Sequence, residues 1–220
     1  EALVRYRDED GNVVSPEKFL PAAERFGVLH QIDHYVLYSV IDVMRDNPKL
    51  HVSVNLSARA LTSERLPELV KSLMTASKVE AERIRFEITE TTMIRNLDRA
   101  KINIRELQEF GCRFALDDFG KGVSSLGYLR DLPVDIIKID GSFVENLQTD
   151  EVNKSIVHAV NEISHMLGKK TVAEYVSSAA ILEEVRAMGI DCVQGWHVFK
   201  PAPIQEFLDR GIENIKLPSE

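Results

Sequence analysis

Two adjacent carboxylates, Asp117 and Asp118, lie near the end of the strand-like segment Arg113–Phe119. Because neighbouring carboxylates at a strand tip can bridge two divalent cations, the pair indicates metal-assisted chemistry. Other apolar segments also end in a polar side chain: Asn55, Glu87, Lys138, Asp140, Glu174 and Gln194. A barrel enzyme that collects its catalytic groups from the tips of several strands has this sequence pattern.

The segments that would position these side chains alternate between strand-like and helix-like patterns. The expected strands are Ala2–Arg7, His51–Leu56, Arg83–Thr89, Arg113–Phe119, Asp135–Asp140, Thr171–Val176 and Cys192–Val198. Between them, apolar residues recur at helical spacing, as in Leu66–Met74, Ile156–Leu167 and Ile181–Met188. This alternation predicts an α/β fold with a parallel sheet. A closed barrel is favoured at this number of strands, and a doubly wound open sheet is the alternative.

Alternation within the strands separates apolar from polar faces. In Arg83–Thr89 the residues Ile84, Phe86 and Ile88 share one face and Glu87 lies on the other. In a barrel the apolar face meets the helices, so the polar residues would point into the lumen. Glu1 stands at the start of its strand, so it can join the other acids only if that strand runs antiparallel to the rest.

Composition narrows the class of protein. A chain of 220 residues suits one large α/β domain, and a net charge of −8 argues against a nucleic-acid polymer as partner. No apolar run approaches the ~18 residues of a membrane span, and no secretory signal opens the chain. We expect a cytoplasmic domain without membrane contact. Cys112 and Cys192 are expected to be buried free thiols.

Nine short segments carry a resemblance to a known family. They are Glu1–Arg5, Val54–Ser57, Phe86–Glu90, Ala115–Gly120, Ser124–Leu126, Leu132–Asp140, Val172–Glu174, Gln194–Gly195 and Lys200–Pro201. In this order, and over nearly the whole chain, they resemble the EAL domain family of cyclic di-GMP phosphodiesterases. The resemblance implies a modified TIM (β/α)8 barrel with an antiparallel first strand. It also implies that residues 1–220 form a single domain, a fragment of a longer multidomain signalling protein.

The resemblance implies a site for two ions, Mg²⁺ or Mn²⁺. The implied ligands of the first ion are Glu1, Asn55, Glu87 and Asp117, and those of the second are Asp117, Asp118 and Glu174, partly through water. Lys138 would contact the attacking water, with Glu174 as the second catalytic residue. The substrate-binding positions would be Leu3, Arg5, Asp140 and Gln194. A set of oxygen donors without thiolate or imidazole suits these ions.

The activity implied by the resemblance is hydrolysis of cyclic di-GMP to linear 5′-pGpG by two-metal activation of water. The alternative is a weakly active or inactive domain that serves as a cyclic di-GMP receptor. A third reading, hydrolysis of another phosphodiester, fits the residues that match the dinucleotide-binding positions less well. The resemblance also implies a homodimer and an upstream sensor or diguanylate-cyclase-like domain.

Two departures from the family pattern bear on activity. Lys121 stands where the loop after the aspartate pair commonly has threonine, and it could weaken activation of the enzyme. Ser177 replaces a glutamate that is common near the metal-bound water, and we expect slower turnover from its loss.

Overall fold

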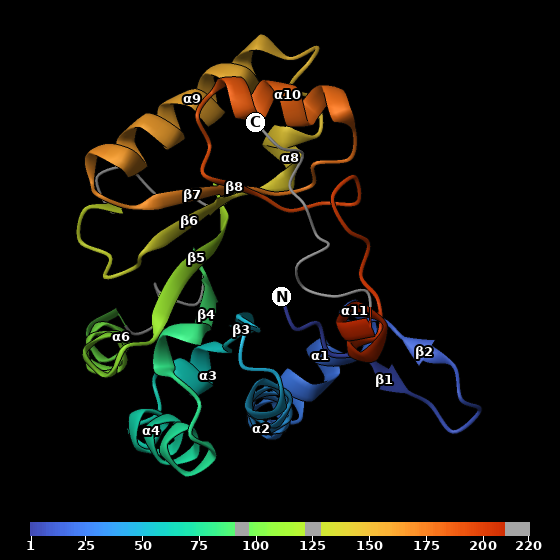
Figure 1. The fold of residues 1–220 in the computed structure, drawn as a ribbon, viewed down its shortest axis with the longest axis vertical. Coiled ribbons are helices and arrows are strands. Elements are labelled where there is room, and N and C mark those ends of the chain that lie inside the picture. The colour runs from blue at the N-terminus through green and yellow to red at the C-terminus, as the bar shows by residue number, and fades with distance from the viewer. Residues whose placement is uncertain (91–96, 122–128, 210–220) are drawn as a thin grey trace. The chain divides into compact units, whose positions relative to one another are not determined.

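The computed structural model describes residues 1–90, 97–121 and 129–209, which fall into two compact units. Among these residues, the first unit comprises 1–88 and 97–113, and the second comprises 89–90, 114–121 and 129–209. Both units alternate strands with helices (Figure 1). The segment 124–126, part of the family resemblance, lies outside the described residues.

The first unit contains most of the N-terminal helices and the first strands. Its helices are α1 (Pro16–Arg25), α2 (Leu29–Asp46), α3 (Ala58–Leu61), α4 (Leu66–Ser77), α6 (Leu97–Phe110) and the short 3-10 helix η1 (Ala81–Arg83). Its strands are β1 (Tyr6–Arg7), β2 (Val13–Val14), β3 (Val52–Asn55) and most of β4 (Ile84–Thr89). Helix α1 begins at Pro16 directly after Ser15, a position where proline is favoured because it costs no hydrogen bond.

Strands β3 and β4 are parallel, and their register aligns their polar ends. Val52 pairs with Ile84, and Asn55 pairs with Glu87. Val54 and Phe86 are fully buried. A shift of one residue would turn these side chains away from the core, so their burial favours the observed register. The predicted alternation of apolar and polar residues therefore places Asn55 and Glu87 side by side at the carboxyl ends of the two strands.

The second unit contains four more strands and the C-terminal helices. Its strands are β5 (Arg113–Phe119, which begins one residue before the unit), β6 (Ile136–Ile139), β7 (Lys170–Ala173) and β8 (Cys192–Val193). Its helices are α8 (Gly141–Val144), α9 (Glu151–Met166), α10 (Ala179–Ala187) and α11 (Ile204–Asp209). The strand order of the main sheet follows the chain, β3-β4-β5-β6-β7-β8.

Helix α9 covers the strands that carry the polar residues of this unit. Figure 1 shows it lying along one face of β6 and β7, and it contacts both strands as well as α8. Its buried residues include Val157 and Val160, and Asp150 caps its start by accepting hydrogen bonds from two backbone N–H groups. On the strands, Ala115, Ile136 and Val172 form a buried cluster. This packing holds β5, β6 and β7 in fixed register.

The predicted α/β class and parallel sheet are confirmed, and the predicted bounds of β5 are those observed. The first expected strand differs in detail. Its end, β1, pairs antiparallel with β2 in a separate two-stranded sheet. Its start meets β3 at an isolated parallel bridge between Ala2 and Val54, where the Ala2 N–H donates to the Ser53 carbonyl at 2.9 Å. The antiparallel pairing therefore lies outside the main sheet.

The two cysteines differ in exposure. Cys112 is buried, as the sequence predicts, and burial raises the pKa of its thiol to about 12. The prediction for Cys192 is wrong, because this thiol is exposed. It belongs to the two-residue strand β8, the last in the strand order, which is covered less than the central strands.

None of the described helices combines the length and hydrophobicity needed to cross a bilayer.

Candidate functional site

In the first unit, three of the predicted site residues lie at the carboxyl end of β3. The Nδ2 group of Asn55 donates a hydrogen bond to Oε1 of Glu1 at 2.7 Å. Glu87 is the register partner of Asn55 on β4 and is buried. Glu1 reaches this end of the strand because Ala2 bridges to Val54, one residue before Asn55. Glu1 therefore reaches Asn55 because its segment bridges to β3 near the carboxyl end of that strand, and not because the segment runs antiparallel to β3.

The predicted substrate-binding residues Leu3 and Arg5 follow Glu1 on the same segment. Leu3 is 41% exposed, although it is a large apolar side chain. Arg5 is exposed, and its guanidinium donates to the carbonyl of Val4 at 2.9 Å. Both side chains are therefore accessible to a molecule outside the protein.

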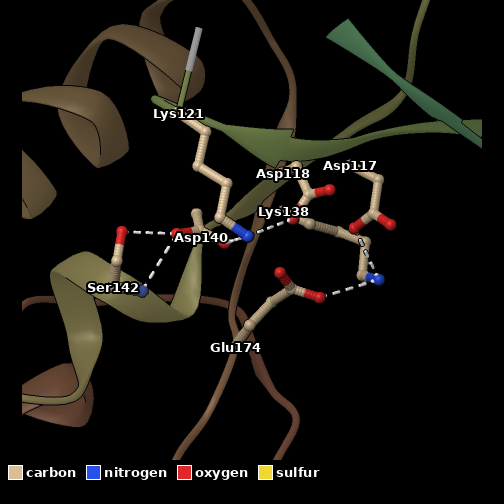
Figure 2. Close-up of polar contacts among 7 residues, drawn as sticks. All are labelled: Asp117, Asp118, Lys121, Lys138, Asp140, Ser142 and Glu174. Carbon is tan, nitrogen blue, oxygen red and sulfur yellow. Dashed lines mark hydrogen bonds and ion pairs between the residues drawn. The ribbon is translucent and has the colours of Figure 1, made fainter. Parts of the chain in front are cut away.

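In the second unit, the aspartate pair sits on an irregular part of β5. The register between β5 and β6 shifts between Leu116 and Phe119, and Asp118 adopts a left-handed conformation with φ of 56°. In a regular strand successive side chains point to opposite faces, but a bulge redirects them. The irregularity explains how both neighbouring side chains face the same group of residues, where Asp117 contacts Lys138 and Asp118 contacts Lys121, as Figure 2 shows.

Lys138 links Asp117 to Glu174. Its Nζ lies 2.8 Å from Oδ1 of Asp117 and 2.9 Å from Oε1 of Glu174. The Lys138 side chain is only 3% exposed, so its charge requires these partners. Burial raises the pKa of Glu174 to about 7; Lys138 opposes this shift and the negative charge of Asp117 adds to it.

Lys121 links Asp118 to Asp140. Its Nζ lies 2.9 Å from Oδ1 of Asp118 and 2.7 Å from Oδ2 of Asp140. The other oxygen of Asp140 accepts hydrogen bonds from the Ser142 backbone N–H at 3.0 Å and from its hydroxyl at 2.5 Å. Burial raises the pKa of Asp140, but the hydrogen bonds from Lys121 and Ser142 outweigh burial and lower the pKa overall. Hydrogen bonds to Asp140 and Asp118 raise the pKa of Lys121.

Close packing of the strand tips brings these residues together. A Cβ atom on Gly141 would lie 2.6 Å from Cβ of Tyr175, the residue after Glu174. A Cβ atom on Gly120 would lie 2.5 Å from Cε2 of Phe143, and Gly120 also has a φ of +106°. Glycine at these two positions lets the loop after β5 approach α8, and lets the start of α8 approach the residues that follow β7.

The result is a cluster of three carboxylates from three strand tips. Asp118, Asp140 and Glu174 each offer an oxygen, and these oxygens all lie within 4.8 Å of one another. Hard cations such as Mg²⁺, Mn²⁺ and Ca²⁺ prefer such all-oxygen sets. The donor chemistry and the spacing of the cluster therefore fit a divalent cation.

Asp118 and Glu174 are among the implied metal ligands, and Asp140 is among the implied substrate-binding positions. Asp117, the other implied bridging ligand, contacts Lys138. Sequence reasoning did not identify Ser142, whose hydroxyl and N–H hold Asp140. Its position two residues after a strand-end aspartate, at the start of a helix, is the signal of an N-cap that could have revealed it.

Gln194 is placed by backbone hydrogen bonds next to the cluster. Its N–H donates to the Ala173 carbonyl at 2.8 Å, and its carbonyl accepts from the Val176 N–H at 3.0 Å. These two bonds flank Glu174 on the chain. The predicted residues of the second unit, Asp118, Asp140, Glu174 and Gln194, therefore gather around the tips of β5, β6 and β7.

The chain is similar to known proteins over most of its length. It matches the family described as EAL domain over residues 1–201. It is 36% identical to the cyclic di-GMP phosphodiesterase PdeF of Escherichia coli (strain K12), over 98% of this chain and 29% of PdeF. It is also 36% identical to the cyclic di-GMP phosphodiesterase PdeB of Shewanella oneidensis, over 96% of this chain and 25% of PdeB. The chain thus spans between a quarter and a third of the length of these relatives.

Two solved structures are similar to the chain throughout. The PaMucR phosphodiesterase in complex with c-di-GMP has a TM-score of 0.88 and 32% identity, over 94% of this chain and 86% of that one. The FimX EAL domain of Pseudomonas aeruginosa bound to c-di-GMP has a TM-score of 0.86 and 28% identity, over 91% and 82% of the two chains. These likenesses confirm the barrel-related α/β fold that the sequence predicts.

Proposed function

Because the chain belongs to the EAL domain family, we propose that it hydrolyses cyclic di-GMP to linear 5′-pGpG with the help of divalent cations. The observation that carries the proposal is the cluster of Asp118, Asp140 and Glu174 beside the buried Lys138. Relatives named as cyclic di-GMP phosphodiesterases match nearly the whole chain, and the chain matches only part of their length. The proposal therefore concerns the reaction of this EAL domain.

The cations in this proposal are Mg²⁺ or Mn²⁺, and two ions are proposed. The proposed ligands are Glu1, Asn55, Glu87, Asp117, Asp118 and Glu174, to which the geometry adds Asp140. When bound, such ions lower the pKa of a coordinated water and neutralise charge on the phosphate. All of these ligands offer oxygen atoms, which is the donor type that both ions prefer.

Lys138 has the geometry of a positioning and charge-stabilising group. Its ammonium is fixed by Asp117 and Glu174 on two neighbouring strands, so its direction is set before any substrate binds. A fixed ammonium in a buried site can orient the attacking water and stabilise negative charge that develops on the phosphoryl oxygens. Glu174, the second proposed catalytic residue, is held by the same contact.

Substrate recognition is proposed for Leu3, Arg5, Asp140 and Gln194. The exposed Arg5 guanidinium suits a phosphate, because it can donate two parallel hydrogen bonds. Asp140 has both oxygens engaged, by Ser142 and by Lys121. Asp140 also offers one of the three clustered oxygens, so the geometry supports a role at the cation cluster more than direct contact with substrate.

The test is incubation of the chain with cyclic di-GMP, with and without Mn²⁺ or Mg²⁺, followed by chromatographic separation of the nucleotides. We expect 5′-pGpG to appear only with the cation, and Asp118→Asn to abolish its formation. Lys154→Met is the control, because this ion-paired lysine lies on α9, away from the cluster. Unchanged cyclic di-GMP in the presence of both cations would refute the proposal.

A second candidate function is a receptor that binds cyclic di-GMP and does not hydrolyse it. Ser177 favours it, because it removes a carboxylate that the family commonly has near the metal-bound water. Equilibrium binding of cyclic di-GMP without cation and without turnover would support the receptor. Recovery of turnover in Ser177→Glu would identify the missing carboxylate as the reason.

The chain is also proposed to act as part of a longer signalling protein. The relative MucR of Pseudomonas aeruginosa is named a bifunctional diguanylate cyclase/cyclic di-GMP phosphodiesterase, and the chain matches 31% of its length. We propose a cytoplasmic location for this domain, an upstream sensor or cyclase-like domain, and a homodimer. Light scattering after size-exclusion chromatography measures the oligomeric state directly.

A further inference from the structure

We propose that Lys121 is an internal cation that competes with the divalent ion for Asp118 and Asp140. To bind at this cluster, the ion must first displace the ammonium of Lys121. The inference rests on the proposed metal-dependent function, and it concerns how readily this chain takes up its cation.

The contacts of Lys121 coincide with the carboxylates of the cluster. Figure 2 shows its Nζ between Asp118 and Asp140, at 2.9 Å from Oδ1 of the first and 2.7 Å from Oδ2 of the second. These residues supply two of the three carboxylates that could hold an ion. An ammonium and a divalent ion at the same oxygens would repel each other strongly, so the two occupants exclude one another.

Ser142 sharpens this competition at Asp140. The backbone N–H and the hydroxyl of Ser142 both bind Oδ1 of Asp140. Oδ2 is therefore the oxygen on which Lys121 and an incoming ion converge. Because Ser142 also fixes the orientation of the carboxylate, Asp140 cannot serve both cations by a simple rotation.

The position of Lys121 makes its displacement feasible. Its side chain is 56% exposed and follows directly on the turn at Gly120, after the end of β5. A lysine of this kind can extend into water on its flexible stem and remain solvated. Lys138, in contrast, is 3% exposed and held within a strand. Lys121 thus has the properties of a reversible occupant.

The measurable consequence is a weakened apparent affinity for divalent ions. Lys121→Met keeps a side chain of similar length and removes the charge, so we expect Mn²⁺ to bind roughly tenfold more tightly, within the usual range of coupling between two ligands. Lys121→Arg keeps the charge, and we expect its affinity to remain near that of the unchanged chain.

The experiment is a calorimetric titration of each metal-free protein with Mn²⁺, without substrate. Lys154→Met is the matched control, because it also removes one lysine charge from an ion pair in the same unit. Tighter binding in Lys121→Met alone supports the inference. Equal affinities in the unchanged chain and Lys121→Met overturn it, as does a similar gain in Lys121→Arg or in Lys154→Met.

The same titration separates this inference from the proposed function. If no variant binds Mn²⁺, the metal site itself fails and the competition fails with it. If the unchanged chain and the three lysine variants bind Mn²⁺ equally, and Asp118→Asn removes the binding, the metal site is supported and only the role of Lys121 is refuted. The thermal midpoint of the metal-free Lys121→Met protein shows whether an altered affinity reflects lost folding.

Discussion

Two lysines in the second unit have the same type of contact and opposite surroundings. Lys138 and Lys121 each place Nζ between two carboxylates at distances of 2.7 to 2.9 Å. Lys138 lies in the buried strand β6, whereas Lys121 lies in the exposed turn after β5. We therefore expect the two lysines to contribute differently to the free energy of unfolding.

Burial is the physical cause of the difference. Around Lys138, Asp117 and Glu174 are only 15% and 18% exposed, so neither water nor salt screens them well. Around Lys121, Asp118 is 42% exposed; Asp140 is only 4% exposed, but it keeps its hydrogen bonds from Ser142 when Lys121 leaves. Lys138 is therefore held in place in the folded protein, whereas Lys121 can leave its partners and enter water.

Removal of Lys138 should have the largest effect. Lys138→Met leaves two carboxylates buried without their cation, and breaking a buried pair in this way costs about 3 kcal/mol of unfolding free energy. Urea denaturation of the metal-free protein at pH 8 measures this loss, with Lys154→Met as the control. A loss below ~1 kcal/mol would mean that Lys138 is as dispensable as an exposed ion-paired lysine.

Addition and removal of metal should have the second-largest effect on stability. Binding of Mn²⁺ to the folded chain at a hundred times its dissociation constant should stabilise it by about 2.7 kcal/mol. Chelation should reverse the gain, and Asp118→Asn should abolish most of it, because Asp118 is one of the three clustered carboxylates. Thermal unfolding with and without Mn²⁺ tests this, and an undiminished shift in Asp118→Asn would contradict it.

The carboxylates beside the two lysines should respond to pH in opposite directions. The pKa of Glu174 is raised to about 7, so the folded metal-free protein holds a proton there that the unfolded chain releases near its ordinary value of 4.5. Stability should therefore fall as pH rises from about 4.5 to about 7, by roughly 2 kcal/mol after allowance for solvent screening. The pKa of Asp140 is lowered, so its contribution is present above 3.8 and lost as pH falls further.

Stability measured against pH in Glu174→Gln tests this difference. The fall between pH 4.5 and 7 should be smaller in the variant, because the residue no longer titrates. An unchanged profile would show that other groups of the chain cause the fall.

Removal of Lys121 should have the smallest effect on stability. Lys121→Met breaks contacts of a side chain that is 56% exposed, and of its two partners Asp118 is exposed while the buried Asp140 keeps two hydrogen bonds from Ser142, so we expect a loss of about 1 kcal/mol or less. Urea denaturation of the metal-free variant measures the change. A loss as large as that of Lys138→Met would remove the distinction between the two lysines.

Much of the fold and part of the candidate site could be predicted from the sequence. The strand-like apolar segment that ends in the aspartate pair predicted β5 with its observed bounds. Strand-end positions identified Asp118, Asp140 and Glu174 as site residues. The prediction of β5 succeeds because a strand-like pattern depends on residues close together in the chain.

Other features depend on register and packing between distant segments. The parallel bridge of Ala2 to Val54 brings Glu1 to Asn55, although the sequence suggested a reversed strand for this purpose. The exposure of Cys192 depends on how β8 ends the strand order. Neither feature leaves a local trace in the residues concerned.

The residues along the chain are enough to predict which carboxylates and lysines lie at strand ends. They are also enough to predict that these strands are parallel. Their partners depend on how distant segments pack: Asp117 contacts Lys138, and Asp118 and Asp140 both contact Lys121. The physical reason is the irregular register of β5 and the left-handed conformation of Asp118, which redirect two neighbouring side chains. A change of register by one residue redirects every side chain of a strand, and packing across the sheet sets that register.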